Sequence, residues 1–443
     1  MPPARYKALV DVLAAEIWAG VLKPGTRLPP HRQLAAQEGL ALVTASRVYA
    51  ELRAMGLVSC EAGRGTYVRD RSLPEGHGID QVDIAPGMLD LNFNYPALPH
   101  QTELLRAGLR QLASTGDLDA LLRYQPHAGR LHEREAFARH AEARGLTVDA
   151  AQVLIVNGAQ HGLAVALIAM LKPGDVIAAD ALTYSGFKVL AQALHLEVVA
   201  IPAGEGGPDL DALARLCKQR RVKAVYTLPT LHNPLGWVMP EAQRVALVAL
   251  ARAHDLLVIE DAAYAYLVEP APTPVAMLAP ERTLYVSGFS KNIATGLRVG
   301  FVIAPVAWVP ALERVIRATA WNTPCVLTAL VTQWLEDGTV GRLEAEKRED
   351  ARARQVIARQ ALQGLAYTAH DTSWFLWLPL PEEARADQVV TVLLNEQIAV
   401  STAEPFAVTP HVPHALRLAL GSVAQPLLKP ALEKVKWAVT AYG

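Results

Sequence analysis

The sequence predicts a multidomain protein: a small helical unit with a two-stranded wing, a large α/β domain, and a small α+β subdomain at the C-terminal end. Three observations predict it. Helical periodicity up to about residue 55 is followed by two short alternating runs. From about residue 150, apolar strands alternate with helical stretches. From about residue 340, a long charged helix precedes further strands. A chain of 443 residues is long enough for two or three such domains.

The first unit is expected to occupy residues 1–70. Apolar residues at helical spacing mark its three helices, and glycine-containing turns such as Lys23-Pro24-Gly25 separate them. The expected helices and strands span 5–19, 31–37, 42–55, 57–59 and 66–68. The unit carries nine basic and six acidic side chains, a net charge of +3, whereas the whole chain has a formal net charge of −1. The basic part of the protein therefore comes first.

A linker rich in glycine, proline and charge is expected at residues 71–87, and the large domain at 88–443. Its expected strands are 153–156, 176–179, 198–201, 224–228, 257–259, 284–286 and 301–304. Helical stretches lie between most of them, as at 162–171, 210–220 and 241–254. This alternation predicts a mostly parallel sheet with helices on both faces. The small subdomain is expected over about 340–443, with strands at 374–378 and 416–420.

The composition excludes several classes of protein. With 51% hydrophobic and 19% charged residues it is typical of a soluble globular chain, and no apolar run reaches the roughly 18 residues that a membrane span needs. Charges interrupt the first residues, so no secretion signal is expected. Cys60, Cys217 and Cys325 are far apart and lack CxxC spacing, which argues against a zinc site or a disulfide framework. We expect no metal and a reducing cytoplasm.

Polar side chains follow the predicted strands of the large domain, where open α/β sheets bind ligands. Lys291 comes after the strand at 284–286, and Arg298 follows it seven residues later. A guanidinium binds a phosphate bidentately. Asp261 directly follows a buried strand, where a carboxylate is costly unless it is paired. Other candidates stand after further strands, at a helix start or in the same loops: Ala159, Gln160, Tyr184, Asn233, Tyr264 and Ser290.

Together these are the groups that pyridoxal 5'-phosphate (PLP) requires. Lys291 would form an imine with the cofactor, and Asp261 would keep the pyridine nitrogen protonated. Asn233 and Tyr264 would donate to the phenolate oxygen. Each residue also has an ordinary interpretation, such as an exposed lysine for Lys291 or a helix N-cap for Asp261.

The other candidates would surround the cofactor's phosphate and ring. Ala159 and Gln160 open a predicted helix, and free N–H groups at a helix start bind phosphate. Arg298 would bind the same phosphate, and Tyr184 would stack on the ring. Taken alone, the helix start is a weak signal, so the prediction depends on the order and spacing of the whole set.

That order and spacing resemble the fold-type I, class I aminotransferase family across roughly residues 90–440. Tyr124-Gln-Pro-His-Ala-Gly129 matches the family's Tyr–Pro–Gly stretch, and Arg417 matches its late arginine. The resemblance implies that Arg417 binds the α-carboxylate of an amino compound. The alternative is a surface arginine on a strand. The family often has a phosphate-binding hydroxyl three residues before the lysine, where this chain has Gly288. Ser287 or Ser290 would then take that role.

The first 70 residues resemble the winged helix-turn-helix of GntR-type regulators. The matching pieces are 20–29, 32–36, 44–56 and 63–66. A recognition helix presents its N-terminal residues to the major groove, and flanking arginines bind phosphates. The expected DNA contacts are Arg32, Thr44, Ser46, Arg47 and Arg64, each of which is otherwise an ordinary solvated side chain. Ala41-Leu42 stands where the family usually has a Ser/Thr-Arg pair, which removes an N-cap and one DNA-contacting arginine.

Both parts together resemble the MocR-type transcriptional regulators of the GntR superfamily, over nearly the whole chain. The resemblance implies a PLP-dependent regulator that binds double-stranded DNA and senses an amino compound, or PLP itself, at Lys291. It also implies a domain-swapped homodimer, with each DNA-binding head packed against the partner's large domain. The second hypothesis is a working aminotransferase that has kept its head. Regulators of this type are expected to show little or no transamination.

Overall fold

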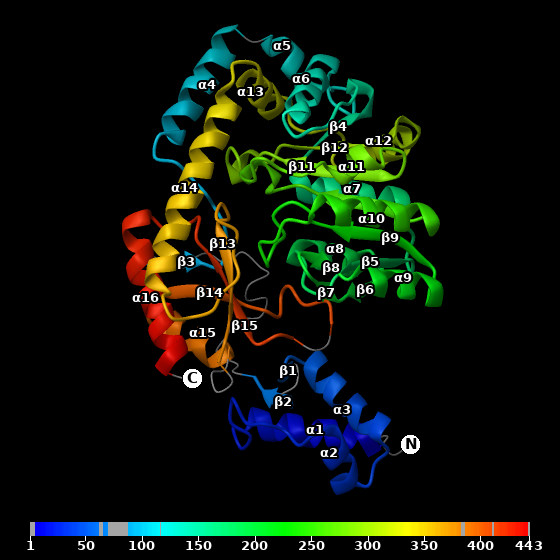
Figure 1. Ribbon diagram of the computed structural model, residues 1–443, viewed down its shortest axis with the longest axis vertical. Coiled ribbons are helices and arrows are strands. Elements are labelled where there is room, and N and C mark those ends of the chain that lie inside the picture. Colours follow the sequence, from blue (N-terminus) through cyan, green and yellow to red (C-terminus); the bar gives the residue numbers. More distant parts are fainter. Residues whose placement is uncertain are drawn as a thin grey trace.

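The computed structural model describes residues 5–61, 65–69, 87–115, 117–381, 386–409 and 412–441 (Figure 1). The expected linker, apart from Gly87, lies outside the described residues, and so does Arg64. The boundaries drawn on either side of that linker stay predictions.

Three helices and a two-stranded sheet form the N-terminal unit, as the sequence predicts. They are α1 (Arg5–Trp18), α2 (His31–Glu38), α3 (Leu42–Ala54), β1 (Val58–Glu61) and β2 (Gly65–Val68). Ala14 of α1 and Val48 and Leu52 of α3 are completely buried in one core, because apolar periodicity gives each helix one apolar face. Ala41 precedes α3 without a side-chain hydrogen bond to the helix start, which confirms the missing N-cap.

A seven-stranded sheet forms the centre of the large domain, in the order β4-β12-β11-β10-β9-β5-β6 among the described residues. Neighbouring strands are parallel except at β12, which is antiparallel to β11 and to β4. The strands are β4 (Val153–Val156), β5 (Val176–Asp180), β6 (Glu197–Ile201), β9 (Val222–Thr227), β10 (Leu257–Asp261), β11 (Thr283–Gly288) and β12 (Gly300–Ile303). Each overlaps one of the apolar runs that the sequence marks as a strand, so the mostly parallel sheet is confirmed.

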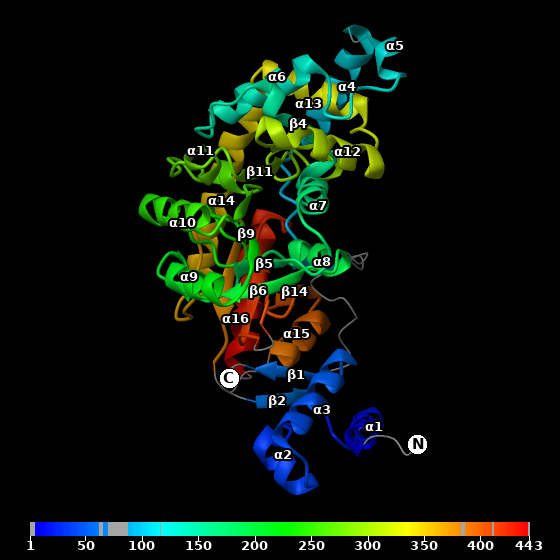
Figure 2. The same cartoon turned by 90° about the vertical axis from the view of Figure 1, so that its right-hand side faces the viewer.

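Helices cover both faces of this sheet (Figure 2). On β4, Leu154 and Val156 belong to one core, whereas Val153 and Ile155 belong to the core on the opposite face. The first face carries α7 (Gly158–Met170), α8 (Ser185–Ala193) and α12 (Val309–Thr319). The second carries α6 (Leu131–Glu142), α9 (Leu210–Gln219), α10 (Glu241–Ala253), α11 (Val275–Leu278) and α13 (Cys325–Glu336). Burial on both faces explains why the strands are continuous apolar runs.

Helix α14 (Thr339–Ala361) leads from the large domain into the small subdomain (Figure 1). The sheet of this subdomain has the order β13-β15-β14-β3. Its elements are β13 (Phe375–Pro379), β15 (Ala415–Ala419), β14 (Ile398–Thr402), β3 (Leu89–Leu91), α15 (Ala386–Asn395) and α16 (Gln425–Ala441). The sequence predicts β13 and β15 but misses β14 and β3; β3 pairs in parallel with β14 through three residue pairs. A three-residue strand has no periodicity to read, and its partner strand lies far along the chain.

The N-terminal unit contacts the small subdomain of the same chain near residues 403–412. The Arg69 guanidinium pairs with the Glu404 carboxylate at 3.1 Å. The N–H of Val412 donates to the Cys60 carbonyl of β1 at 3.2 Å. These contacts join the head to the part of the chain that borders the cavity described below. Among the described residues, no helix is both long and apolar enough to cross a membrane.

Candidate functional site

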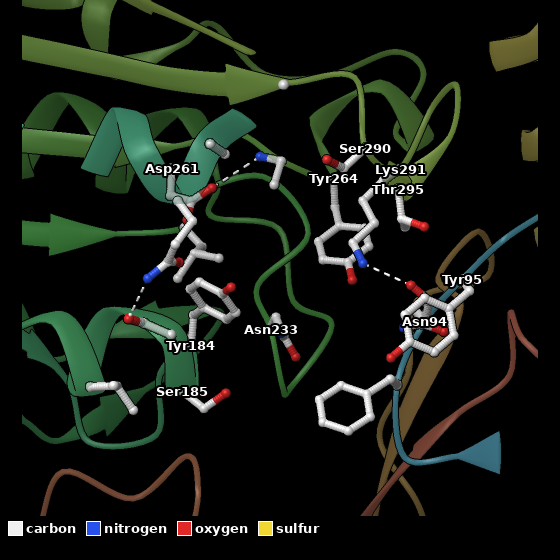
Figure 3. Close-up of a pocket in the computed structure, with 18 of the residues that line it drawn as sticks. Asn94, Tyr95, Tyr184, Ser185, Asn233, Asp261, Tyr264, Ser290, Lys291 and Thr295 are labelled. Atoms are coloured by element: carbon white, nitrogen blue, oxygen red, sulfur yellow. Dashed lines mark hydrogen bonds between the residues drawn. The ribbon is translucent and has the colours of Figure 1, made fainter. Parts of the chain in front are cut away.

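A cavity of about 810 Å³ opens where the large domain meets the small subdomain, at the carboxyl ends of β10 and β11. All ten residues that the sequence proposes for cofactor and effector line this cavity: Ala159, Gln160, Tyr184, Asn233, Asp261, Tyr264, Ser290, Lys291, Arg298 and Arg417. Figure 3 shows most of them converging on one space from separate loops. The structure thus brings them together, and their individual roles stay predictions.

Lys291 lies in the loop after β11, with its side chain in the cavity. Its Nζ donates to the Asn94 carbonyl at 2.8 Å and lies 5.9 Å from the centre of the Tyr264 ring (Figure 3). The main-chain carbonyl of Lys291 accepts hydrogen bonds from Tyr266 Oη at 3.0 Å and from Lys347 Nζ at 3.1 Å. Hydrogen bonds therefore hold both the side-chain amine and the main chain of Lys291.

Asp261 is the last residue of β10 and is 3% exposed. Its carboxylate accepts hydrogen bonds from Tyr226 Oη at 2.8 Å and from the N–H of Ala263 at 3.0 Å. Burial raises the pKa of the Asp261 carboxyl, and these two hydrogen bonds oppose the rise. A buried carboxylate in a fixed orientation suits a cationic partner that enters the cavity.

The start of α7 and Arg298 form a cradle for an anion. Helix α7 begins at Gly158 and has no side-chain cap, so its first N–H groups are free of such a partner. Arg298 donates to Ser290 Oγ at 2.7 Å. Gly158 has φ +78°, and a Cβ added there would lie 2.5 Å from Arg298 Nη2. Only glycine allows this approach of guanidinium and helix start.

Gly288 belongs to the same cradle and explains the missing hydroxyl at that position. A Cβ on Gly288 would lie 3.1 Å from the main-chain nitrogen of Ala159, at the start of α7. Of the two serines that the sequence offers as replacements, Ser290 lines the cavity and contacts Arg298. Ser287 does not line it, and its hydroxyl donates to the Ala262 carbonyl at 3.4 Å. The geometry therefore favours Ser290.

Arg417 lies on β15, is 4% exposed, and faces the cavity from the small subdomain. Its Nη1 donates to the Asn92 carbonyl at 2.9 Å, and its Cζ lies 5.0 Å and 5.8 Å from the ring centres of Phe375 and Phe406. Its Nε has no hydrogen-bond partner among the described residues. Burial lowers the pKa of this guanidinium, which marks a desolvated cation suited to an anionic group.

Segment 92–96, which no pattern in the sequence marks, forms a wall of the cavity. Its alternate carbonyls accept from three cations on three separate elements: Asn92 from Arg417 at 2.9 Å, Asn94 from Lys291 at 2.8 Å, and Pro96 from Lys347 at 2.9 Å. Phe93, Tyr95, Thr295 and Phe406 also line the cavity without being predicted. The segment contributes main-chain carbonyls, which every residue carries, so no side-chain pattern marks it.

The four predicted DNA contacts within the described residues, which leave out Arg64, lie on α2 and α3. Arg32 is exposed, and Arg47 is 62% exposed, pairs with Glu51 at 3.6 Å and lies over the Tyr6 ring. Thr44 and Ser46 are half-buried.

Two further observations on α3 refine this set. The Ser46 hydroxyl is already engaged, since it lies 3.0 Å from His31 Nδ1 and donates to the Leu42 carbonyl. Val43, which is not among the predicted contacts, is 81% exposed near the start of α3. An apolar residue directly after the missing N-cap at Ala41 and Leu42 is the sequence signal that could have identified it.

Comparison with known proteins decides the family. Residues 86–435, more than half of the chain, match the model described as aminotransferase class I and II. The chain belongs to this family. Residues 5–68 match a second model, bacterial regulatory proteins of the gntR family. The two matches together give the architecture of the MocR-type regulators.

Both transcriptional regulators and aminotransferases are among the proteins that resemble this chain. It is 28% identical to the uncharacterized HTH-type transcriptional regulator YjiR of Escherichia coli K12, over 98% of both chains. It is 26% identical to the HTH-type pyridoxine biosynthesis transcriptional regulator PdxR of Corynebacterium glutamicum, over 98% of this chain and 95% of that protein. Among solved structures, LysN, an α-aminoadipate aminotransferase of Thermus thermophilus complexed with N-(5'-phosphopyridoxyl)-L-leucine, matches with a TM-score of 0.73 and 26% identity, over 84% of this chain and 98% of that one.

Membership of the aminotransferase class I and II family implies a PLP cofactor, and the residues of this cavity fit it. The glycines at 158 and 288 leave the helix start open beside Arg298. Two buried side-chain oxygens, Asn233 Oδ1 and Gln160 Oε1, have no hydrogen-bond partner among the described residues. Unpartnered buried polar atoms are rare in folded proteins and indicate a ligand with polar groups.

Proposed function

We propose that this protein is a PLP-dependent, DNA-binding transcriptional regulator that senses an amino compound, or PLP itself, at Lys291. The observation that carries the proposal is the ion pair between Arg69 of the N-terminal unit and Glu404. Glu404 stands two residues before Phe406, which lines the cavity beside Arg417. A DNA-binding unit and a cofactor cavity are thus joined through three consecutive residues.

The chain's own residues have separable tasks in this proposal. Bound PLP supplies an aldehyde that condenses with a primary amine and releases water. Lys291 Nζ is the amine that holds the cofactor covalently. Asp261, fixed by Tyr226 and the main chain of Ala263, holds negative charge beside the pyridine nitrogen. Arg298 and the start of α7 bind the phosphate.

The remaining residues recognise the effector and the faces of the cofactor. Arg417 binds a carboxylate of the effector, because a buried guanidinium with a free Nε has lost its water without gaining a full set of partners. Asn233 and Tyr264, which line the same cavity, would bind the phenolate oxygen of PLP, and Tyr184 would stack on its ring.

Coupling between the cavity and the head follows from how the segment 404–406 is held. Lys188 of α8 donates to the carbonyls of Glu404 at 3.1 Å and of Pro405 at 2.9 Å. A ligand that changes the position of Arg417 or Phe406 therefore also changes the position of Glu404, which forms the ion pair with Arg69. The ligand changes DNA affinity only if the protein has two conformations that differ in the position of residues 404–406 and the ligand binds these conformations with different affinity.

The test of this coupling is Glu404→Gln. We expect PLP and DNA to bind the variant nearly as they bind the wild type, while the change in DNA affinity on adding an amino ligand shrinks several-fold. The measurement is fluorescence anisotropy with a DNA site recovered by genomic selection. Glu396→Gln is the matched control, since Glu396 forms an exposed ion pair with Lys434 away from the head.

Two outcomes would contradict the proposal in different ways. If genomic selection and gel shifts recover no DNA site, the protein is not a regulator. If DNA binds but its affinity never depends on PLP or on any amine, the sensing part of the proposal is wrong.

The exposed start of α3 predicts how DNA is bound. Arg47→Ala is expected to weaken all DNA sequences alike and to lower the slope of log K against log salt by about 1, because Arg47 binds a phosphate. Val43→Ala is expected to relax sequence preference, by about 5-fold or more at one base position, because an exposed valine contacts a thymine methyl group. Binding to a randomised library at two salt concentrations measures both. Equal effects on every sequence would contradict the assignment of Val43.

A working aminotransferase is the second candidate function. It is favoured by the complete set of cavity residues and by the likeness to LysN, which is an aminotransferase. Multiple turnover with an amino acid and a 2-oxo acid distinguishes it from a regulator. A third possibility, a sensor of PLP alone, is favoured by the likeness to PdxR, a regulator of pyridoxine biosynthesis. In that case DNA affinity would follow PLP concentration without any added amine.

We also propose that the protein acts as a homodimer, with each head packed against the large domain of the other subunit. A two-fold symmetric dimer would present its two heads to two symmetric half-sites of DNA. Light scattering after size-exclusion chromatography measures the number of subunits.

A further inference from the structure

Lys347 is a buried ammonium group for which the proposed function has no use so far. It lies on α14 and is completely buried. Its Nζ donates to three main-chain carbonyls: Pro96 at 2.9 Å, Lys291 at 3.1 Å and Ile293 at 2.6 Å. An ammonium has three N–H donors, so these bonds use all of them. All three partners are neutral carbonyls rather than carboxylates.

A charge in such a place is costly. Burial lowers the pKa of Lys347 to about 7; Asp350 opposes the shift and the Lys291 charge adds to it. A buried ion without an ionic partner stabilises a fold less than an apolar side chain of similar volume. Stability of α14 alone therefore gives no reason for a lysine at this position.

The three carbonyls that Lys347 binds belong to two segments that contact Lys291 or contain it. Those of Lys291 and Ile293 belong to the loop that carries the reactive amine. That of Pro96 belongs to the segment 92–96, whose Asn94 carbonyl accepts from Lys291 Nζ. One ammonium thus fixes both the main chain of Lys291 and the wall that its side chain contacts.

We propose that Lys347 is a positioning residue for Lys291: by binding the carbonyls of Lys291, Ile293 and Pro96 it sets the distance between the reactive amine and the wall of the cavity. The inference deepens the proposed function and rests on attachment of the cofactor at Lys291. Lys347 touches no reacting atom itself. Its effect is on how fast the Lys291 amine meets the cofactor's aldehyde, not on how tightly the cofactor's phosphate and ring are held.

The test separates these two quantities. Lys347→Met is expected to slow covalent attachment of added PLP about 10-fold or more, because small displacements of a reacting group have large effects on rate. Attachment is followed by visible absorbance and by borohydride trapping. Binding of pyridoxamine 5'-phosphate, which has the same ring and phosphate but no aldehyde, is expected to change less than about 2-fold, since it needs only the cradle and Asp261.

Three further variants make the result decisive. Tyr266→Phe removes the other side-chain donor to the Lys291 carbonyl and is expected to slow attachment in the same direction, by less. Lys347→Arg keeps a cation with several donors and is expected to retain more of the rate than Lys347→Met. Lys434→Met is the matched control, because Lys434 is exposed on α16, pairs with Glu396, and should leave both measurements unchanged.

The outcomes are distinguishable from those of the proposed function. If the wild type attaches PLP at Lys291 and Lys347→Met does so at the same rate, the positioning role is wrong and the regulator proposal stands. If Lys347→Met weakens pyridoxamine 5'-phosphate as much as it slows PLP, Lys347 is only structural, and the inference is overturned. If wild type and Lys291→Ala behave alike, the cofactor assignment itself fails.

Lys347 also predicts a pH dependence that needs no cofactor. Its pKa is about 7 in the folded chain against an ordinary value of 10.5, so between these values the unfolded chain binds a proton that the folded chain does not. The contribution of Lys347 to the free energy of unfolding is therefore lowest below about pH 7, where the folded chain also carries this proton, and it rises from there to about pH 10. Lys347→Met should flatten this rise in unfolding temperature against pH. The charged neighbours, Asp350 and Lys291, are unchanged in the comparison.

Discussion

Lys291→Ala is expected to abolish covalent attachment of PLP completely while the protein stays folded. Lys291 Nζ lies in the cavity, whereas its main chain is held by Tyr266 and Lys347, contacts that the substitution leaves in place. The visible absorption of the protein incubated with PLP should be lost, and borohydride should trap no adduct. Unfolding temperature and pyridoxamine 5'-phosphate binding show whether the cavity survives.

Lys188→Ala is the matched control for this result. Lys188 is also partly buried, and burial lowers its pKa to about 8, so it is a nucleophilic amine near neutral pH. It donates to the carbonyls of Glu404 and Pro405 and does not line the cavity. We expect the variant to keep the absorption band. A band lost in Lys188→Ala and kept in Lys291→Ala would move the site to Lys188.

Arg417→Met should remove the response to amino acids while leaving PLP bound. Two charge-assisted hydrogen bonds between a desolvated guanidinium and a carboxylate contribute about 3 kcal/mol or more, so the amino acid concentration needed to shift the cofactor's absorption should rise about 100-fold or more. Arg417→Lys should recover only part of this, since an ammonium does not bind a carboxylate bidentately.

A primary amine without a carboxylate is the internal control for Arg417. Its effect on the absorption band should be nearly the same in the wild type and in Arg417→Met, because it has nothing for the guanidinium to bind. If the variant responds to amino acids as the wild type does, Arg417 serves only to hold the Asn92 carbonyl and the adjacent rings.

Residues at strand ends could be predicted because two-sided burial makes the strands of a parallel sheet visible in the sequence. Asp261 and Lys291 stand where β10 and β11 end, and both line the cavity. Arg417 is predicted only through the family resemblance, because nothing in the pattern of β15 distinguishes a binding arginine from a surface one.

The rest of the site could not be predicted from the sequence pattern, for a physical reason. Segment 92–96 acts through carbonyl oxygens, which are independent of side-chain type, and β3 is ordered by a strand far along the chain. Lys347 lies in a helix rich in charged residues, where a buried lysine looks like its solvated neighbours. Long-range contacts, rather than local preference, decide these positions.

The strand β3 has a mechanical consequence. Among the described residues, β3 is the first element of the body after the N-terminal unit, and the chain continues from it directly into segment 92–96. Once its contacts with Glu404 and Val412 are broken, traction on a DNA-bound head is transmitted along the backbone to a strand at the edge of the described sheet, joined to β14 by three residue pairs. Under load this joint should peel before the seven-stranded sheet is strained. The wall of the cavity would then respond to tension in the chain as well as to what the cavity binds.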